Sequence, residues 1–274
     1  MKSFFQCGEA SICYEVAGEG SAVVLVHEGI ADRRMWEPQV EPFVAAGYRV
    51  VRYDLRGYGD STLPPGPFSH TGDLRALLEH LELDRARIVG VSVGGRVALE
   101  LALAHPELVE SLVLVGAGLR EWEWSDEIRR FGEEEDELLD NGKIDEAVEL
   151  NLRTWVDGPS RGPDKVDPGM RERVAEMQRR AVEIYFAALA SGPPPGPEDP
   201  FDPPVSERLG EIRCPTLVLA GALDQPDILE IADRLAAGIP EARQEIVPGT
   251  AHVPPMEKPA EFNELVLGFY EQAG

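Results

Sequence analysis

The feature that most constrains this chain is the sequence Gly90–Gly94, which reads Gly-Val-Ser-Val-Gly and has Ser92 at its centre. A short apolar run over residues 88–91 leads into it, and an apolar, helix-like segment follows over residues 95–104. This order predicts a tight strand-to-helix turn, with Ser92 in an unusual backbone conformation and its hydroxyl held clear of the sheet. The flanking glycines fit such a turn because side chains there would collide with the neighbouring strand or helix. An ordinary glycine-rich turn without chemistry is the alternative.

Apolar runs rich in β-branched residues recur along the chain, at residues 23–26, 50–53, 88–91, 112–115 and 217–220. Runs without polar alternation are typical of strands that are buried on both faces of a parallel sheet. Helical patterns, such as residues 74–81 and 262–269, alternate with these runs and predict an α/β fold whose sheet is covered on both faces. Residues 3–7 and 10–16 alternate in polarity and predict an N-terminal hairpin.

The strand and helix alternation breaks between about residues 120 and 206. That stretch holds helical and acidic segments and ends in a proline-rich return over residues 192–204, which is typical of a stiff linker. We therefore expect an α/β core made of residues 1–118 and 207–274, with residues 119–206 inserted as a helical lid.

Composition narrows the possible partners. The formal net charge of -24 disfavours binding to nucleic acid and to anionic membrane surfaces. No apolar run reaches the length of a membrane span or resembles a signal peptide, and the three cysteines have no metal-ligand spacing. The sequence thus predicts a cytoplasmic protein with reduced thiols, no metal and no cofactor, active as a monomer or homodimer on a small molecule.

A serine hydroxyl is a poor nucleophile unless a base removes its proton, so the five histidines are the next candidates. His252 lies in a loop between the short apolar run 245–247 and the last helix. That loop is at the carboxyl edge of the predicted sheet, where ligands and catalytic groups collect in open α/β folds. The other four histidines lie in or beside helices or end a strand, so His252 is the predicted base.

The histidine needs a carboxylate that selects its tautomer and stabilises its charged form. Asp224 follows the run 217–220 directly and reaches the same edge of the sheet. The alternative is Asp227, which stands where a helix begins and where an aspartate is usually a cap. With Asp224, the chain order is serine, aspartate, histidine.

These segments together resemble the α/β-hydrolase superfamily along nearly the whole chain. The matching segments are Leu25–Gly29, Tyr53–Ser61, the turn around Ser92, Gly221–Asp224, Gly249–His252, and Pro255 with Pro259. The nearest resemblance is to the lidded esterase and lactonase branch, which includes enol-lactone hydrolases. It implies a mostly parallel eight-stranded sheet with helices on both faces and a helical lid over the site. One departure is Glu28, because family members usually have His-Gly where this chain has His27-Glu28-Gly29.

An oxyanion hole needs two amides that point at the developing negative oxygen. The N–H of Val93, directly after the nucleophile, is the first, and the resemblance implies the N–H of Gly29 as the second. A carboxylate beside this hole would oppose catalysis, so we expect Glu28 to point away or to pair with a base. The nearby bases are Arg33, Arg34 and Arg96. His27 is expected to brace the loop through hydrogen bonds.

Aromatic residues of the predicted lid are candidates for a substrate pocket beside His27 and Glu28. They include Trp122, Trp124 and Trp155. Their side chains line an apolar pocket in one interpretation and pack the lid onto the core in the other.

The predicted function is that of a cofactor-free serine hydrolase acting on a small carboxylic ester or lactone. Thioester, carbon–carbon and perhydrolytic reactions use the same fold and stay open, as does a non-catalytic small-molecule receptor. Dehalogenases and epoxide hydrolases are disfavoured because they need a carboxylate nucleophile where Ser92 stands. A dinucleotide-dependent oxidoreductase is excluded because no Gly-x-Gly-x-x-Gly follows the first parallel strand.

Overall fold

Eight strands form one sheet in the order β1-β2-β4-β3-β6-β7-β9-β10 in the computed structural model, which describes residues 1–273. The strands are β1 (Lys2–Cys7), β2 (Ala10–Ala17), β3 (Ser21–Val26), β4 (Tyr48–Tyr53), β6 (Ala86–Val91), β7 (Val109–Val115), β9 (Thr216–Gly221) and β10 (Arg243–Val247). β2 pairs antiparallel with β1 and with β4, and every other pairing in this sheet is parallel. The predicted hairpin and mostly parallel sheet are therefore confirmed.

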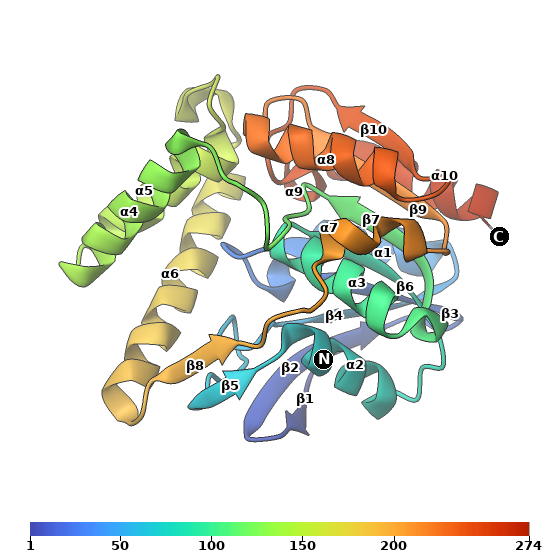
Figure 1. Cartoon of the computed structure of the whole chain (residues 1–274), viewed down its shortest axis with the longest axis horizontal. Coiled ribbons are helices and arrows are strands. Elements are labelled where there is room, and N and C mark those ends of the chain that lie inside the picture. The colour runs from blue at the N-terminus through green and yellow to red at the C-terminus, as the bar shows by residue number, and fades with distance from the viewer. Residues whose placement is uncertain (274) are drawn as a thin grey trace.

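Helices cover both faces of the sheet (Figure 1). They are α1 (Glu37–Ala45), α2 (His70–His80), α3 (Val93–Ala104), α8 (Pro226–Gly238) and α10 (Pro259–Ala273). Successive side chains of a strand point to opposite faces, so Val24 and Val26 of β3 pack with α2, α3 and α8. Val23 and Leu25 pack with α1 and α10 in a second core. This double burial is why the strands have continuous apolar runs.

The chain between β7 and β9 leaves the sheet and forms α4 (Asp126–Asp140), α5 (Ile144–Asn151), a π-helix (Leu152–Asp157) and α6 (Pro168–Ser191). In Figure 1, α4, α5 and α6 stand to the left of the sheet. Side chains cap two of these helices: Ser125 accepts the N–H of Ile128 in α4, and Asp167 accepts the N–H of Met170 in α6. None of the helices within residues 1–273 combines the length and the apolar character that crossing a membrane requires.

The proline-rich return is more ordered than a linker. Pro195–Glu198 forms β8, which pairs in parallel with β5 (Gly66–Phe68) in a separate two-stranded sheet. Prolines are tolerated here because a strand at the edge of a sheet does not need every N–H in its ladder. The expectation of a plain linker is wrong over these residues. Their pairing fastens the return to the core, and a short helix, α7 (Val205–Arg208), then leads back to β9. Gly274, the last residue of the expected core, lies outside the described residues.

Candidate active site

Ser92 occupies the turn between β6 and α3 in a left-handed conformation, with φ 52° and ψ -112°. A non-glycine residue in this region carries strain, which persists only where the surrounding structure enforces it. Tight backbone packing on both sides of Ser92 holds the turn in this conformation. A Cβ on Gly90 would collide with the backbone of Gly94, and a Cβ on Gly94 would collide with the Val26 carbonyl of β3. The N–H of Ser92 also donates to the Val115 carbonyl at the end of β7, at 2.9 Å. The predicted strained turn is present.

Asp224 and His252 meet at the carboxyl edge of the sheet, in the loops that follow β9 and β10. The distance between His252 Nδ1 and Asp224 Oδ2 is 2.8 Å, and both side chains are buried. The other carboxylate oxygen of Asp224 accepts the backbone N–H of Gln225. Gly116, at the end of β7, leaves room for the ring, because a Cβ there would come within 3.1 Å of two imidazole atoms.

The environment of His252 prepares it to exchange a proton. Asp224 can only accept at Nδ1, so Nδ1 carries the hydrogen and Nε2 is left as the acceptor. Burial favours the neutral ring, but the charge and hydrogen bond of Asp224, together with the charge of Glu28, raise the pKa of His252 above its usual value. The ring is therefore a stronger base than a free imidazole and is held in one tautomer.

Asp227 lies apart from this pair, in the first turn of α8. Its Oδ1 accepts the indole N–H of Trp122 at 3.2 Å and the backbone N–H of Ser125 at 2.8 Å. These bonds tie α8 to the segment that leads into α4. Asp224, and not Asp227, is thus the carboxylate on His252.

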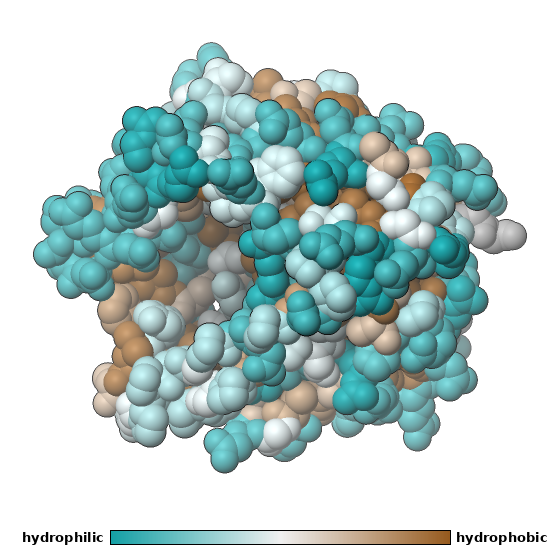
Figure 2. Space-filling view, in the orientation of Figure 1, coloured by the Kyte–Doolittle hydropathy of each residue, from teal (hydrophilic) through white to brown (hydrophobic). Residues whose placement is uncertain are grey.

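A cavity of about 710 Å³ lies between the core and α4–α6, and Ser92 and His252 both line it. Figure 2 shows a hollow between the helices on the left and the rest of the molecule. Trp155, from the π-helix, also lines it, with its ring centroid 4.9 Å from that of His252. Phe131 of α4 packs edge-on against Trp155 at 5.6 Å. Gly29 and Val93 belong to the same wall, and a Cβ on Gly29 would lie 3.5 Å from a Val93 methyl group.

Three residues expected near the pocket do not line this cavity: Trp122, Trp124 and His27. The two tryptophans pack against the core on the side of α3 and α8, where the Asp227 carboxylate holds Trp122. His27 is buried between loops: its Nε2 accepts the N–H of Leu55 at 2.8 Å, and its Nδ1 donates to the Glu28 carbonyl at 2.6 Å. Burial lowers the pKa of His27 to about 4, so it is a neutral brace.

Glu28 contradicts the sequence expectation, because its side chain points into the site. Its carboxyl group is 1% exposed, and Oε2 lies 4.0 Å from His252 Nε2. No hydrogen-bond partner for Oε1 is found in residues 1–273. The arginines expected to pair with it bind other carboxylates: Arg33 binds Asp54 and Asp60, Arg34 binds Asp32, and Arg96 binds Glu100 and Glu198. Burial raises the pKa of Glu28 to about 7.

Glu28→Gln is expected to raise the Tm at pH 8.5 and to change it little at pH 4.5. The pKa of this carboxyl is about 7 in the folded chain against 4.5 for a free glutamate, so folding favours its protonated form. That favourable contribution is complete below about pH 4.5 and is lost as the pH rises through about 7. The loss is on the order of 3 kcal/mol, since each pKa unit is worth about 1.4 kcal/mol. Differential scanning calorimetry measures the shift, with the exposed Glu134→Gln as control. Equal shifts at both pH values would contradict it.

Polar residues of the cavity wall that the sequence does not indicate include Tyr58, Glu135, Asn151 and Gln178. Only Tyr58 carried a local signal, since it belongs to the segment Tyr53–Ser61 that resembles the family. Glu135 stands in the acidic run of residues 133–137, and its carboxylate accepts a hydrogen bond from Asn151.

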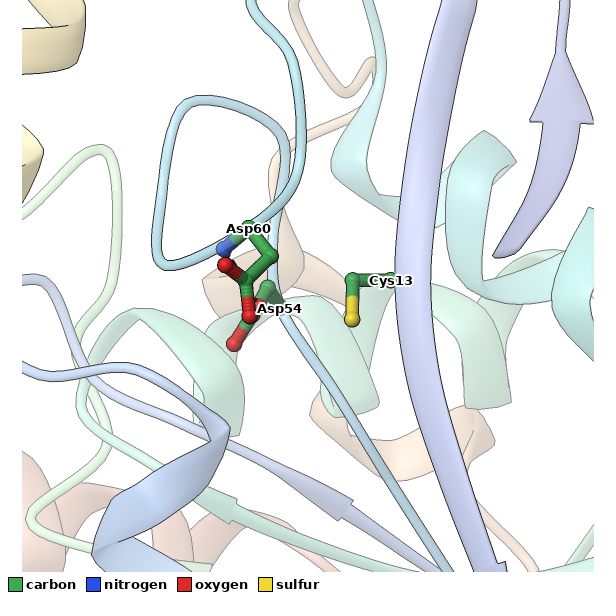
Figure 3. A group of neighbouring side chains, drawn as sticks. All are labelled: Cys13, Asp54 and Asp60. Atoms are coloured by element: carbon green, nitrogen blue, oxygen red, sulfur yellow. Dashed lines mark hydrogen bonds between the residues drawn. The ribbon is translucent and has the colours of Figure 1, made fainter. Parts of the chain in front are cut away.

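A group of metal-ligating side chain types lies outside the cavity, formed by Cys13, Asp54 and Asp60 (Figure 3). Their ligand atoms lie within 4.8 Å of one another. The Arg33 guanidinium binds both carboxylates and supplies the positive charge that a metal ion would bring. Burial raises the pKa of the Cys13 thiol to about 12, so it stays protonated and is a poor ligand. The group fits an ion-paired structural role.

Comparisons with known proteins agree with this architecture. A model of the alpha/beta hydrolase family matches residues 23–265. The 2-hydroxy-6-oxononadienedioate/2-hydroxy-6-oxononatrienedioate hydrolase of Paraburkholderia xenovorans is 31% identical over 96% of this chain and 91% of its own length. The structure of an N-acyl homoserine lactone degrading enzyme superposes with a TM-score of 0.75, at 28% identity and with 97% and 100% of the two chains covered. A thermophilic esterase from Thermogutta terrifontis gives a TM-score of 0.79, at 25% identity over 100% and 99%. The family match runs from β3 into α10, and the chain is a member of the alpha/beta hydrolase family.

Proposed function

We propose that this chain is a serine hydrolase that cleaves a small carboxylic ester or lactone through an acyl-enzyme. The observation that carries the proposal is the buried 2.8 Å pair between Asp224 and His252 at the same cavity wall as the strained Ser92 turn. A relative that degrades lactones and another that is an esterase support the substrate class.

In the proposed reaction, His252 Nε2 takes the proton of the Ser92 hydroxyl while Oγ attacks the substrate carbonyl carbon. The resulting imidazolium is stabilised by Asp224, and it returns the proton to the leaving alkoxide as the carbon–oxygen bond breaks. Water then repeats the sequence on the acyl-enzyme: His252 accepts a proton from water, hydroxide adds to the acyl carbon, and Ser92 leaves with the proton.

The negative oxygen of each tetrahedral intermediate would receive hydrogen bonds from Val93 N–H and Gly29 N–H. Val93 is the first residue of α3, so its N–H has no acceptor within the helix and lies at the positive end of the helix dipole. Gly29 lies on the same wall beside the Val93 side chain, which is consistent with two donors that converge on one point.

Active-site labelling tests this proposal directly. A fluorophosphonate should form one covalent adduct, and peptide mass spectrometry should locate it on Ser92. A nitrophenyl ester of a short acid should also give a burst of nitrophenol equal to the enzyme concentration wherever deacylation is slower than acylation. A chain that binds esters without any adduct on Ser92 is a receptor, and the hydrolase proposal then fails.

We further propose that residues 119–206 act as a lid that sets substrate size, with Trp155 as its contact to the site. Trp155→Ala should shift the preferred acyl chain length upward, because removing the indole beside His252 enlarges the cavity. Trp122→Ala is the matched control: it should lower Tm without changing the ranking of esters, since Trp122 binds Asp227 instead of lining the cavity. The measurement is kcat/KM over p-nitrophenyl esters of graded length. The reverse pattern would remove Trp155 from the pocket.

A further inference from the structure

Some charged side chains of the cavity wall form ion pairs with residues of opposite charge, and others do not. Besides His252, the described lining residues that can carry a charge are Glu28, Glu135, Glu198, Arg56 and His70. Burial lowers the pKa of His70 to about 4, so His70 is neutral and the other four remain. Arg56 is already paired, since its guanidinium binds both carboxylate oxygens of Asp73, at 2.7 and 3.0 Å. The wall therefore offers a ligand no unpaired cation within residues 1–273.

Glu198 of β8 is also neutralised. Arg96 of α3 reaches it at 2.9 Å, and Arg120, from the segment after β7, reaches it at 2.6 Å. Both arginines also bind Glu100, so two cations and two anions form a closed network behind the wall. Its two positive and two negative charges balance, so Glu198 is not an unpaired anion of the cavity wall.

The remaining two carboxylates, Glu28 and Glu135, have no arginine or lysine partner within residues 1–273, and the nearest basic group to Glu28 is His252, at 4.0 Å. Glu135 accepts one hydrogen bond, from the neutral amide of Asn151, and Glu28 has an orphaned oxygen in a side chain that is 1% exposed. Burial raises the pKa of both groups. Tyr58 lines the same cavity as both carboxylates, and burial, followed by the charges of Glu135 and Glu198, raises its pKa to about 12, with Arg96 opposing and Glu28 adding to the shift. These carboxylates thus act on a common space.

A neutral side chain, Gln178, adds another hydrogen-bond acceptor without a donor within residues 1–273 to the same cavity. Gln178 of α6 lines the cavity and is 6% exposed, and its side-chain carbonyl oxygen finds no donor among the described residues. A buried acceptor without a donor is costly unless a ligand or water satisfies it. Three separate parts of the chain thus contribute negative potential to the cavity. They are the loop after β3, with Glu28, helix α4, with Glu135, and helix α6, with Gln178.

We propose that this cavity selects esters or lactones that carry a positively charged group such as an ammonium, and rejects those that carry a carboxylate. This specificity rests on the proposed hydrolase function, and Glu28 and Glu135 are its determinants. A cation supplies the missing counter-charge and favours the ionised form of both carboxyls. A carboxylate would face two like charges in a low-dielectric space, with no free arginine or lysine among the described lining residues to receive it.

Thioesters and esters of similar size and different charge test the specificity. Butyrylthiocholine, its uncharged isostere 3,3-dimethylbutyl thiobutyrate, and S-butyryl-3-mercaptopropionate place the charge on the leaving group. A second series of p-nitrophenyl esters places a trimethylammonium, a tert-butyl or a carboxylate at the end of the acyl chain. At pH 8 we expect kcat/KM to be about tenfold higher for the cation than for the neutral isostere in at least one series, and about tenfold lower for the carboxylate in both.

Variants assign the effect to the two glutamates. Glu135→Gln and Glu28→Gln should each reduce the ratio of cationic to anionic kcat/KM severalfold. Glu134→Gln is the matched control: it removes the same charge one residue away on α4, where the side chain is exposed, and should leave the ratio unchanged. Equal kcat/KM for all three esters, or a preference for the carboxylate, overturns the proposal.

A binding measurement separates this proposal from the hydrolase proposal. If no ester is cleaved and no adduct forms on Ser92, the hydrolase function fails, and the charge preference is measured by calorimetry instead. Phenyltrimethylammonium should then bind at least tenfold more tightly than benzoate, and Glu135→Gln should reduce the difference. Equal affinities would overturn the charge preference on their own.

Discussion

Ser92→Ala is expected to lower kcat for p-nitrophenyl esters by 10⁴-fold or more, on the order of the losses seen when a triad serine is removed. The physical reason is that Ser92 supplies the hydroxyl at this strained turn, in the same cavity that His252 lines, so without it the acyl-enzyme cannot form. Steady-state kinetics and fluorophosphonate labelling measure the loss.

The fold should survive this change. Alanine keeps the Cβ, and the turn is enforced by backbone contacts at Gly90 and Gly94, so Tm should move little. Ser160→Ala, at an exposed position, is the control and should keep full activity. Retained activity in Ser92→Ala, with a label on another serine, would end the proposed mechanism.

Asp224→Asn is expected to cost about 10⁴ in kcat, since an amide no longer enforces the tautomer with a free Nε2 and no longer stabilises the imidazolium. The change should also alter the pH profile. Asp224 helps to raise the pKa of His252, and His252 must be neutral to act as a base. Without that carboxylate, the residual activity should reach its plateau at a lower pH than in the unaltered chain. The pH dependence of kcat/KM measures this shift.

Asp227→Asn is the matched control for the Asp224 variant. It should lower Tm through weaker bonds to Trp122 and Ser125, while kcat changes little. A large loss of kcat in Asp227→Asn with a small one in Asp224→Asn would reassign the acid.

Local sequence predicted those features of the fold and the site that depend on one short segment of the chain. Glycines on either side of Ser92 predicted a strained turn, and its φ of 52° agrees. Continuous β-branched runs predicted buried parallel strands, because each strand must present apolar side chains to two cores. The position of Asp224 directly after a strand favours it over Asp227 as the triad acid, and Asp224 is the carboxylate that binds His252.

Local sequence failed where partners compete across the chain. The expected arginine partner of Glu28 was reasonable from proximity, but Asp54 lies directly beside Arg33 in the folded chain and takes the guanidinium. Prolines predicted a linker over Pro195–Glu198, yet pairing with β5, far away in sequence, makes a strand. Trp122 and Trp155 looked equivalent as aromatic residues of one insertion, and only their hydrogen-bond and ring partners separate them.

The sequence by itself determined the sheet, the strained Ser92 turn and the edge at which Asp224 and His252 meet, because backbone conformation and burial period are properties of neighbouring residues. Only the tertiary structure decided that Glu28 faces His252, with no arginine or lysine bound to it within residues 1–273, and that Glu135 joins it at the same cavity. The net charge of such a space depends on which distant arginines are already bound to other carboxylates. Which carboxylate an arginine binds depends on how distant segments pack in the folded chain, and this information is not contained in any local sequence pattern.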